Sequence, residues 1–471
     1  MKSLVRSLYI FAVITSFTFF VTSCSSISSV EYKKFQQPAT DILITNTNVL
    51  SEDGRAMLPN QNVLIQNGLI TAITVNAISS ESALVIDGQE KYLIPGLIDS
   101  HVHLQDSEND LLVYLAHGIT YVREMSGNDQ HHKWREEINE GRVAPSIEVS
   151  SEKISSKSGL WGLINEFFWT RINISSEQDA MALAESLKDD NYANAKISSD
   201  INKEMYFAIT KAAKKTSLSV TGHIPGTVSF EEFLESGQGE IAHIEELVKM
   251  MNREFGYFTT ANGDDFLKFI EERSREVAGK LKERNISVSS SFWYMQSIPE
   301  QVSNLPDLIE ELDLSFTNPE RVTEWMPEKN DFALNHTHLI EWWSIFAKAN
   351  EVVLRELIKN ETVILVGTDA MTSLVIPGIS LHQELAALVN AGMSNTQAIN
   401  NATRIPAEWM GVKVGKLSKG YAADILILNN NPLEDIDATR DIQAVIKGGR
   451  LYKKELLESM LDSIRRTYSH R

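Results

Sequence analysis

The sequence is nearly free of cysteine, since Cys24 is the only one among 471 residues. A single thiol excludes any internal disulfide. Basic residues are also few: 44 Lys and Arg stand against 63 Asp and Glu, which gives a formal net charge of −19. Binding to nucleic acid requires a basic face, so the composition argues against a nucleic-acid partner. Repeats of the solenoid type are absent. Hydrophobic residues make up 43% of the chain, enough for the core of one large domain and a smaller one.

The first residues predict a targeting segment. Lys2 and Arg6 precede an apolar stretch over residues 8–21, which is too short to span a bilayer comfortably. Cys24 follows Val21-Thr22-Ser23, a pattern that resembles a bacterial lipoprotein signal. We therefore expect residues 1–23 to be removed, Cys24 to carry lipid, and the exported protein to be anchored to a membrane of the cell envelope. An ordinary secretory signal with an incidental cysteine is the alternative. Residues 24–40 are Ser-rich and polar and predict a tether.

Short strands are expected near both ends of the remaining chain. Alternating apolar and polar residues predict strands over residues 41–50, 62–70, 69–75 and 84–88, with Asn67-Gly68 forming a hairpin turn. Residues 420–428 and 442–452 predict a second group of strands. Neither group has enough strands to cover its own hydrophobic face, so we expect the two groups to meet rather than to form separate small sheets.

Strands and helices alternate between these ends. Strands are expected at residues 92–104, 120–124, 146–150, 193–198, 218–224, 239–244, 286–292 and 362–369. Helices are expected between them and after the last strand, with Ser175 or Ser176 capping one helix and Ser394 opening another through a capping box with Gln397. This alternation predicts an α/β fold with a parallel barrel.

Two histidines stand out on the first of these strands. Side chains alternate along a strand, so His101 and His103 face the same way and their imidazoles can bind one cation. By itself this spacing is more often found in solvated strands. The flanking residues Pro95-Gly96-Leu97-Ile98-Asp99, however, resemble the first barrel strand of the amidohydrolase superfamily, whose members are metal-dependent hydrolases. Gly367-Thr368-Asp369-Ala370 and residues 377–392, 401–407 and 420–424 are also similar, specifically to the imidazolonepropionase and Xaa-Pro dipeptidase-like branch.

The resemblance implies a fold and its domain limits. It implies a (β/α)8 TIM barrel over residues 95–410, beside a small β-sandwich domain built from residues 41–94 and 411–455. Residues 456–471 would form a C-terminal helix or tail. Active sites of such barrels lie at the carboxyl ends of the strands.

The resemblance also implies a ligand set and a role for each member. Candidate metal ligands at the strand ends are His101, His103, Lys196, His223, His243 and Asp369. One divalent ion, with zinc as the default, would lie between His101, His103 and Asp369, and a second on His223 and His243. Lys196 would be carboxylated by CO2, and the carbamate would bridge the two metals. The alternatives are an unmodified lysine, a packed loop histidine at His223 and a helix cap at Asp369.

The implied chemistry is hydrolysis of a C–N bond. A metal-bound water would attack the substrate carbonyl as hydroxide, and Asp369 would pass the proton to the leaving amine. We expect a small-molecule substrate such as a dipeptide or an N-acyl amino acid. A cyclic amide, a lactone or a phosphotriester is the alternative substrate, and a non-catalytic barrel lipoprotein is the alternative class. His223-Ile224-Pro225-Gly226 departs from the His-Ala-x-Gly of many peptidase-like members, which leaves substrate recognition by this loop open.

Long loops add aromatic residues around the expected site. Residues 296–350 exceed what a barrel crossover needs and predict a lid or a pocket wall. We expect an aromatic mouth, or alternatively simple packing of long loops, from Trp161, Phe167, Phe168, Trp169, Phe292, Trp293, Tyr294, Trp325, Trp342 and Trp343. The remaining histidines His131, His132, His336 and His338 are expected on surface loops. His382 and Glu384 are expected to pack on the helix after the eighth strand.

Overall fold

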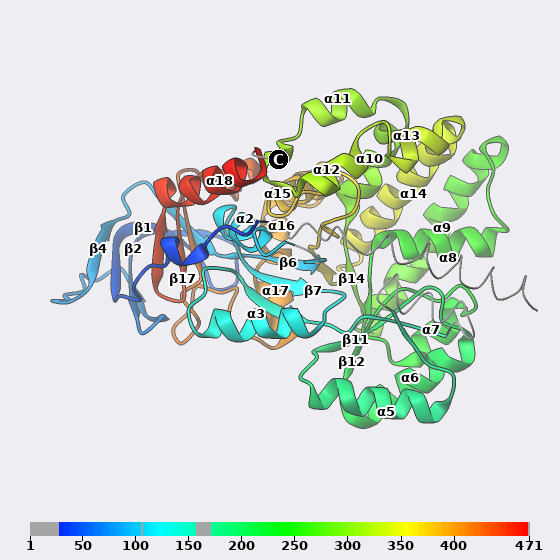
Figure 1. The fold of residues 1–471 in the computed structure, drawn as a ribbon, viewed down its shortest axis with the longest axis horizontal. Coiled ribbons are helices and arrows are strands. Elements are labelled where there is room, and N and C mark those ends of the chain that lie inside the picture. The colour runs from blue at the N-terminus through cyan, green and yellow to red at the C-terminus, as the bar shows by residue number, and fades with distance from the viewer. Residues whose placement is uncertain (1–27, 105–106, 157–170, 470–471) are drawn as a thin grey trace, which may run out of the picture.

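The protein consists of a sheet at one end and a body of parallel strands surrounded by helices (Figure 1). A computed structural model describes residues 28–104, 107–156 and 171–469. The predicted targeting segment with Cys24 therefore lies outside the described residues, as do Trp161, Phe167, Phe168 and Trp169. Within the described residues, no helix is both long and apolar enough to cross a membrane.

Both chain ends contribute to one mixed sheet, shown at the left of Figure 1. Its strands are β1 (Ile42–Leu50), β2 (Met57–Gln66), β3 (Leu69–Thr74), β4 (Leu84–Asp87), β5 (Tyr92–Pro95), β16 (Ile425–Leu428), β17 (Ile442–Lys447) and β18 (Arg450–Lys453). The order is β18-β17-β16-β5-β1-β2-β3, with β4 beside β1. The predicted meeting of the two ends is thus confirmed, and the junction is the antiparallel pair β5 and β16.

The expected two-layer sandwich is not confirmed, because these strands form a single eight-stranded sheet. Asn67 and Gly68 both adopt positive φ, 53° and 74°, between β2 and β3. These angles suit the type I′ hairpin that the sequence predicted. Inward-facing Ile42, Ile44 and Ile65 are fully buried, so the sheet packs one apolar face into the core.

The parallel strands form three sheets. The first is β6 (Leu97–Val102), β7 (Ile119–Glu124) and β8 (Ser146–Val149), and the last is β13 (Glu240–Ile241), β14 (Ser287–Ser289) and β15 (Ile364–Leu365). Between them lie β9 (Lys153–Ser155), β10 (Arg171–Asn173), β11 (Asn194–Ile197) and β12 (Ser219–Gly222), in the order β10-β9-β11-β12. The parallel α/β architecture is confirmed, and it is built from three sheets rather than one regular sheet. The β9–β10 pair was not predicted.

Backbone hydrogen bonds join these sheets at their edges. Ala193 N donates to Val149 O at 2.9 Å, which joins β8 to the approach to β11, and Gly239 N donates to Val220 O at 3.0 Å, which joins β12 to the approach to β13. Ser100 N donates to Val366 O at 2.9 Å and so joins β6 to the end of β15. The last parallel sheet is therefore bonded to the first.

Helices follow most of the parallel strands. They are α2 (Asp110–Ala116), α3 (Asp129–Asn139), α5 (Glu177–Asp189), α6 (Lys203–Thr216), α7 (Phe230–Ser236), α8 (Ile244–Phe255), α9 (Gly263–Glu283), α14 (Ile340–Lys359), α15 (Ile379–Asn390), α16 (Asn395–Asn401), α17 (Arg404–Met410) and α18 (Lys454–Ser469). Two predicted caps are present: Ser176 Oγ accepts from Asp179 N at 3.1 Å, and Ser394 forms a capping box with Gln397. Such a cap stabilises a helix by about 1 kcal/mol.

The segment between β14 and β15 forms a helical layer, at the top of Figure 1. It begins with α10 (Phe292–Ser303), α11 (Leu305–Glu310), α12 (Pro319–Trp325) and α13 (Asp331–Asn335) and ends with α14. Trp325 is buried with Leu305, Leu308, Leu374 and Ile376 in a small core of its own. Trp325 therefore packs this layer and does not belong to the aromatic mouth in which the sequence placed it.

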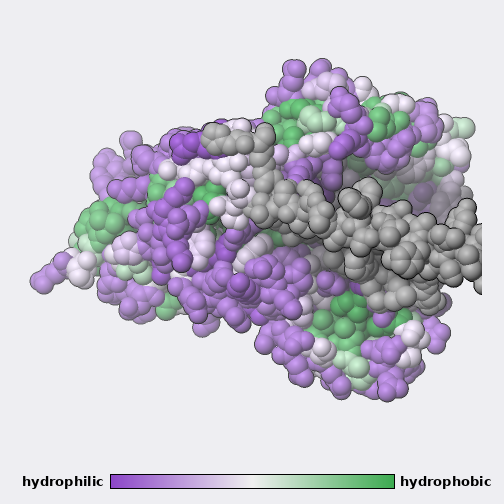
Figure 2. Space-filling model, in the orientation of Figure 1, coloured by the Kyte–Doolittle hydropathy of each residue, from purple (hydrophilic) through white to green (hydrophobic). Residues whose placement is uncertain are grey.

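The surface agrees with the acidic, polar composition. Hydrophilic residues predominate on the face in Figure 2, with apolar residues in separate patches. Large hydrophobic residues that are exposed include Leu58, Leu69, Val75, Leu84 and Val85, all within or next to β2, β3 and β4.

Candidate metal centre

The strand ends bring the predicted ligands together. His101 is at the end of β6, Lys196 is in β11, and His243 follows β13 at the first turn of α8. Asp369 follows β15, and His103 and His223 come directly after β6 and β12. Parallel strands place their carboxyl ends at one face of the fold, which explains how residues so far apart in the sequence meet.

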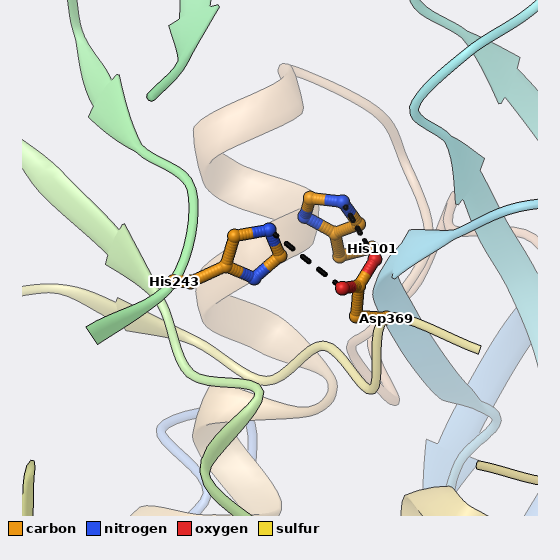
Figure 3. A group of neighbouring side chains, drawn as sticks. All are labelled: His101, His243 and Asp369. Carbon is orange, nitrogen blue, oxygen red and sulfur yellow. Dashed lines mark ion pairs between the residues drawn. The ribbon is translucent and has the colours of Figure 1, made fainter. Parts of the chain in front are cut away.

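His101, His103 and His243 surround the Asp369 carboxylate. His101 Nε2 lies 3.3 Å and His103 Nε2 lies 3.2 Å from Asp369 Oδ1, and His243 Nε2 lies 3.8 Å from Asp369 Oδ2. Figure 3 shows His101, His243 and Asp369 converging from three different parts of the fold. The ligand atoms of these three residues lie within 4.8 Å of one another, a spacing that suits a shared cation.

Lys196 and His223 complete the group. Lys196 Nζ lies 3.1 Å from His101 Nε2, and the side chain is fully buried. The His223 ring lies 5.5 Å from the His243 ring, and its Nδ1 is 2.6 Å from Ser199 Oγ. All of the predicted ligands are thus linked to one another by contacts of this kind.

The charge states of these groups favour metal binding. Burial lowers the pKa of His101 well below its ordinary value. Burial likewise lowers the pKa of His243 to about 4, and lowers the pKa of His223 well below its ordinary value. Burial would raise the pKa of Asp369, but its contacts with His243 and His103 hold the pKa below its usual range. Neutral imidazoles and an ionised carboxylate are the forms that ligate a metal.

Several buried nitrogen atoms lack partners. His101 Nδ1, His103 Nδ1 and His223 Nε2 are buried and have no hydrogen-bond partner among the described residues. Buried polar atoms without partners are rare and usually mark an ion, a water or a catalytic role. Together with the mix of imidazole and carboxylate donors, they fit a divalent transition metal such as zinc.

The backbone at two of these residues is unusual. His243 has φ 75° and Asp369 has φ 59°, in the region that costs most non-glycine residues about 1–3 kcal/mol. Close packing maintains these conformations. A Cβ on Gly367 would lie 2.8 Å from His101 Cβ, so only glycine allows the end of β15 to approach β6 here.

Asp99 connects the two strands that carry the cluster. Its Oδ1 accepts hydrogen bonds from Thr368 N at 3.0 Å and His101 N at 3.2 Å, and its Oδ2 accepts from Thr368 Oγ1 at 2.7 Å. Asp99 therefore fixes His101 and Asp369 relative to each other. Asp99 is two residues from His101 in β6 and so shares its strand face, but this spacing alone does not predict a positioning role.

Two acidic residues and a serine lie close to the histidine rings. Glu124 Oε1 lies 3.8 Å from His103 Nδ1 and accepts from Ser126 N at 2.6 Å. Glu246 Oε1 lies 3.9 Å from His223 Nδ1, and Ser291 Oγ lies 2.9 Å from His243 Nδ1. Of these contacts, that of Ser291 with His243 is within hydrogen-bond distance, and such a partner determines the orientation and tautomer of a metal-binding ring.

A buried ion pair lies beneath the centre. Arg123 of β7 binds Glu240 of β13, with Arg123 Nη1 2.7 Å from Glu240 Oε2, and Arg123 Nε donates to Ser100 O at 2.7 Å. Thr221 Oγ1 also donates to Glu240, at 2.6 Å. The pair connects β7 to β13. Removing one member of such a buried pair lowers stability by about 3–5 kcal/mol. Sequence reasoning missed the pair because the partners are 117 residues apart.

The surface-loop prediction was wrong for His131 and His132, which both lie in α3. His131, expected on a surface loop, is buried: its Nδ1 accepts from Asn128 N at 3.1 Å in the cap of α3, and its Nε2 lies 3.2 Å from Leu104 O. His338 is exposed, whereas His132 and His336 are partly buried. His382 and Glu384 are buried on α15, in agreement with the packing roles expected for them. Glu384 accepts hydrogen bonds from Phe292 N at 2.8 Å and Trp293 N at 2.6 Å, at the start of α10.

An aromatic cavity lies between helices that begin near the metal centre, since α8 follows His243 and α10 follows Ser291, but none of the six candidate ligands lines it. It has a volume of about 460 Å³ and is lined by α8, α10, α13 and α14, with Tyr294, Phe332, Trp342, Trp343 and Phe346 among its residues. Glu245 of this cavity is two residues from His243, and burial together with the charges of Glu245 and Asp369 raises the pKa of Tyr294. Tyr294, Trp342 and Trp343 therefore form part of the aromatic surface that the sequence predicted, whereas Phe292 is buried in the core.

Comparison with known proteins gives the family. Residues 92–452 match the family model described as the amidohydrolase family. The chain belongs to the amidohydrolase family. This amidohydrolase is 22% identical over 453 residues to a 5'-deoxyadenosine deaminase from Methanosphaera stadtmanae, covering 88% of this chain and 93% of the relative.

Solved structures share this fold. Bottromycin amidohydrolase superposes on this amidohydrolase with a TM-score of 0.72 and 18% identity over 92% of both chains. A Xaa-Pro dipeptidase with bound methionine gives a TM-score of 0.63 and 18% identity, over 88% of this chain and all of the other. At these identities the likeness is one of fold.

Proposed function

We propose that this amidohydrolase is a binuclear metal-dependent hydrolase that cleaves an amide bond in a dipeptide or an N-acyl amino acid. The observation that carries the proposal is the convergence of Lys196 with the histidines and Asp369. Lys196 Nζ lies 3.1 Å from His101 Nε2, and burial lowers the pKa of Lys196 well below its ordinary value. A neutral lysine amine is the form that reacts with CO2, and the resulting carbamate would offer two oxygens to two ions.

The residues divide into two sets around Lys196. His101, His103 and Asp369 would hold one ion, and His223 and His243 the other, with zinc the default for this donor set. When bound, the ions acidify water and polarise a carbonyl. Asp369 is ionised at neutral pH, so it is able to accept a proton from water and return it to the leaving amine. Its two oxygens lie toward different histidines, which holds the carboxylate in one orientation.

A hydrolysis panel tests this function. Zinc- and bicarbonate-treated protein would be incubated with dipeptides, N-acyl amino acids, cyclic amides, a lactone, a phosphotriester and 5'-deoxyadenosine, and products would be quantified by mass spectrometry. We expect amine release from dipeptides or N-acyl amino acids. Ammonia release from 5'-deoxyadenosine alone would instead assign a deaminase. Turnover of only the cyclic or ester substrates would indicate the same metal site acting on a different bond. Inactivity with no metal bound would favour a binding protein.

The finer features of the fold belong to the same proposal. We propose that the eight parallel strands β6, β7, β8, β11, β12, β13, β14 and β15 form a (β/α)8 barrel, supported by the hydrogen bonds that join the three sheets edge to edge. We likewise propose the Xaa-Pro dipeptidase-like branch for the chain, and lipid anchoring through Cys24 in the cell envelope. Incorporation of labelled palmitate in bacteria, abolished by Cys24→Ala, is the expected result for the anchor.

A further inference from the structure

We propose that the aromatic cavity near the metal centre binds a substrate carboxylate through Arg253, at a distance from the scissile amide. This inference rests on the proposed hydrolase function and adds the substrate class: an amide that carries a large apolar or aromatic group and a remote carboxylate. The cavity of about 460 Å³ is large enough for such a group.

Arg253 is the unsatisfied cation of this cavity. It lies in the last turn of α8 and lines the cavity, and its Nη2 is buried without a hydrogen-bond partner among the described residues. The side chain as a whole is half-buried and Nη2 is closed to solvent, so an occupant reaches this nitrogen only after the guanidinium turns toward the cavity. Among the described residues, no acidic side chain forms an ion pair with Arg253, although acidic residues outnumber basic ones 63 to 44 in the chain.

The other charges of the cavity are already paired. Lys249 Nζ lies 2.5 Å from Glu245 Oε1 and 3.0 Å from Glu246 Oε1, so this lysine is bound by two carboxylates of its own helix. Arg253 therefore supplies the positive charge that remains available to an occupant. Guanidinium groups bind carboxylates through two parallel hydrogen bonds, which also determines the orientation of the ligand.

The aromatic wall is held rigidly. The Trp342 ring stacks on Phe258 at 4.8 Å and on Phe346 at 5.1 Å, and Trp343 Nε1 donates to His336 Nδ1 at 3.2 Å. The Phe332 and Trp343 rings form a T-shaped pair with their centroids 5.4 Å apart. A wall ordered in advance binds an apolar group without the entropic cost of ordering several large side chains.

Helix geometry gives the approximate distance between the metal centre and Arg253, which the occupant would have to span. His243 precedes the first residue of α8 and Arg253 is ten residues further along the chain, so their Cα atoms are separated by about 15 Å at 1.5 Å per residue. The Arg253 side chain tilts back toward the start of the helix, which shortens this span. Even so, the carboxylate lies further from the metal centre than the α-carboxylate of a dipeptide would, and we therefore favour extended amides such as N-acylated peptides.

Calorimetric titration of the full chain in detergent tests the carboxylate site without turnover. The probes are 4-phenylbutanoate and its neutral counterpart 4-phenylbutanamide. We expect the carboxylate to bind roughly tenfold to hundredfold more tightly, as a hydrogen-bonded charge pair predicts. In Arg253→Gln this preference should disappear, while Arg275→Gln, which changes an exposed arginine on α9, should leave it intact.

The outcomes separate this site from the metal centre. Equal affinity of the two probes, or a preference that survives in Arg253→Gln, would overturn the proposal, the second result indicating that the carboxylate binds the metals. Trp342→Ala should weaken both probes alike, and unchanged binding there would contradict the aromatic wall. Thermal unfolding of each variant identifies any loss of fold. Because no hydrolysis is measured, failure of the proposed function would leave these results interpretable.

Discussion

Lys196 is the residue on which the binuclear assignment depends. A lysine amine does not ligate a cation, yet this side chain is fully buried and its Nζ lies 3.1 Å from His101 Nε2. Partners that only orient a ligand are worth 10- to 100-fold in metal affinity or activity, so loss of a bridging group should exceed about 100-fold.

Lys196→Ala should therefore lose at least about 100-fold in kcat/KM, and added short carboxylic acids should restore part of it by supplying bridging oxygens. The measurement is hydrolysis of the best substrate with and without added propionate, and metal content is determined in parallel. Lys214→Ala, on the outer side of α6, is the matched control. Full activity of Lys196→Ala without added acid would show that Lys196 does not bridge the two metals.

Asp369 is expected to move protons as well as to bind metal. Its carboxylate is surrounded by three histidines, and an amide at this position would keep one oxygen donor. Asp369→Asn should retain most of the metal and lose about 10²- to 10⁴-fold in turnover, the usual contribution of a general acid–base group. Metal content and single-turnover rates separate the two effects. An unchanged rate would exclude Asp369 from proton transfer.

Some residues of the site could be predicted from the sequence and others could not. The ligands were predictable because each follows an apolar strand, and strand ends converge in parallel α/β folds. Asp99 and the Arg123–Glu240 pair were missed because their partners are set by three-dimensional packing rather than by spacing. His131 was misplaced because a polar sequence around it concealed its role in capping α3.

Among the elements, α10 is positioned by a buried acid. Glu384 on α15 accepts from Phe292 N and Trp293 N, and the preceding residue Ser291 contacts His243 Nδ1. Burial raises the pKa of Glu384 to about 7 from 4.5. The folded state thus binds a proton on Glu384 more tightly than the unfolded state does. Its contribution to stability is complete below pH 4.5 and is lost as the pH rises toward about 7.

Glu384→Gln should remove this dependence, because glutamine does not titrate. The free energy of unfolding of the wild type should fall relative to that of the variant as the pH rises from 4.5 to about 7. Urea unfolding at several pH values measures it, with Glu408→Gln, a surface carboxylate paired with Arg404 and Lys416, as the control. A constant difference between wild type and Glu384→Gln would contradict the raised pKa.

The elements themselves were predicted unevenly. The order of parallel strands and the two capped helices follow from local apolar runs and cap residues, which act within a few positions of the chain. The β9–β10 pair, the helical layer between β14 and β15 and the burial of Trp325 depend on contacts between distant segments. The aromatic residues of the loops predicted that a cavity near His243 would be aromatic, but they did not predict which rings would line it.

At the scale of the whole molecule, the chain ends build one sheet and the middle of the chain builds the site. The family match over residues 92–452 covers the parallel body and the C-terminal strands, while β1 to β4 lie before it. The central claim for the molecule is that ligands from β6, β11, β12, β13 and β15 together hold two metal ions.

Metal stoichiometry tests this claim most directly. Protein exchanged into zinc and bicarbonate, then freed of loosely bound metal, would be measured by inductively coupled plasma mass spectrometry. We predict two zinc ions per chain, and fewer zinc ions in His223→Ala, because this substitution removes a ligand of only one ion. A ratio near zero, or one ion per chain that is unaffected by His223→Ala, would contradict this prediction.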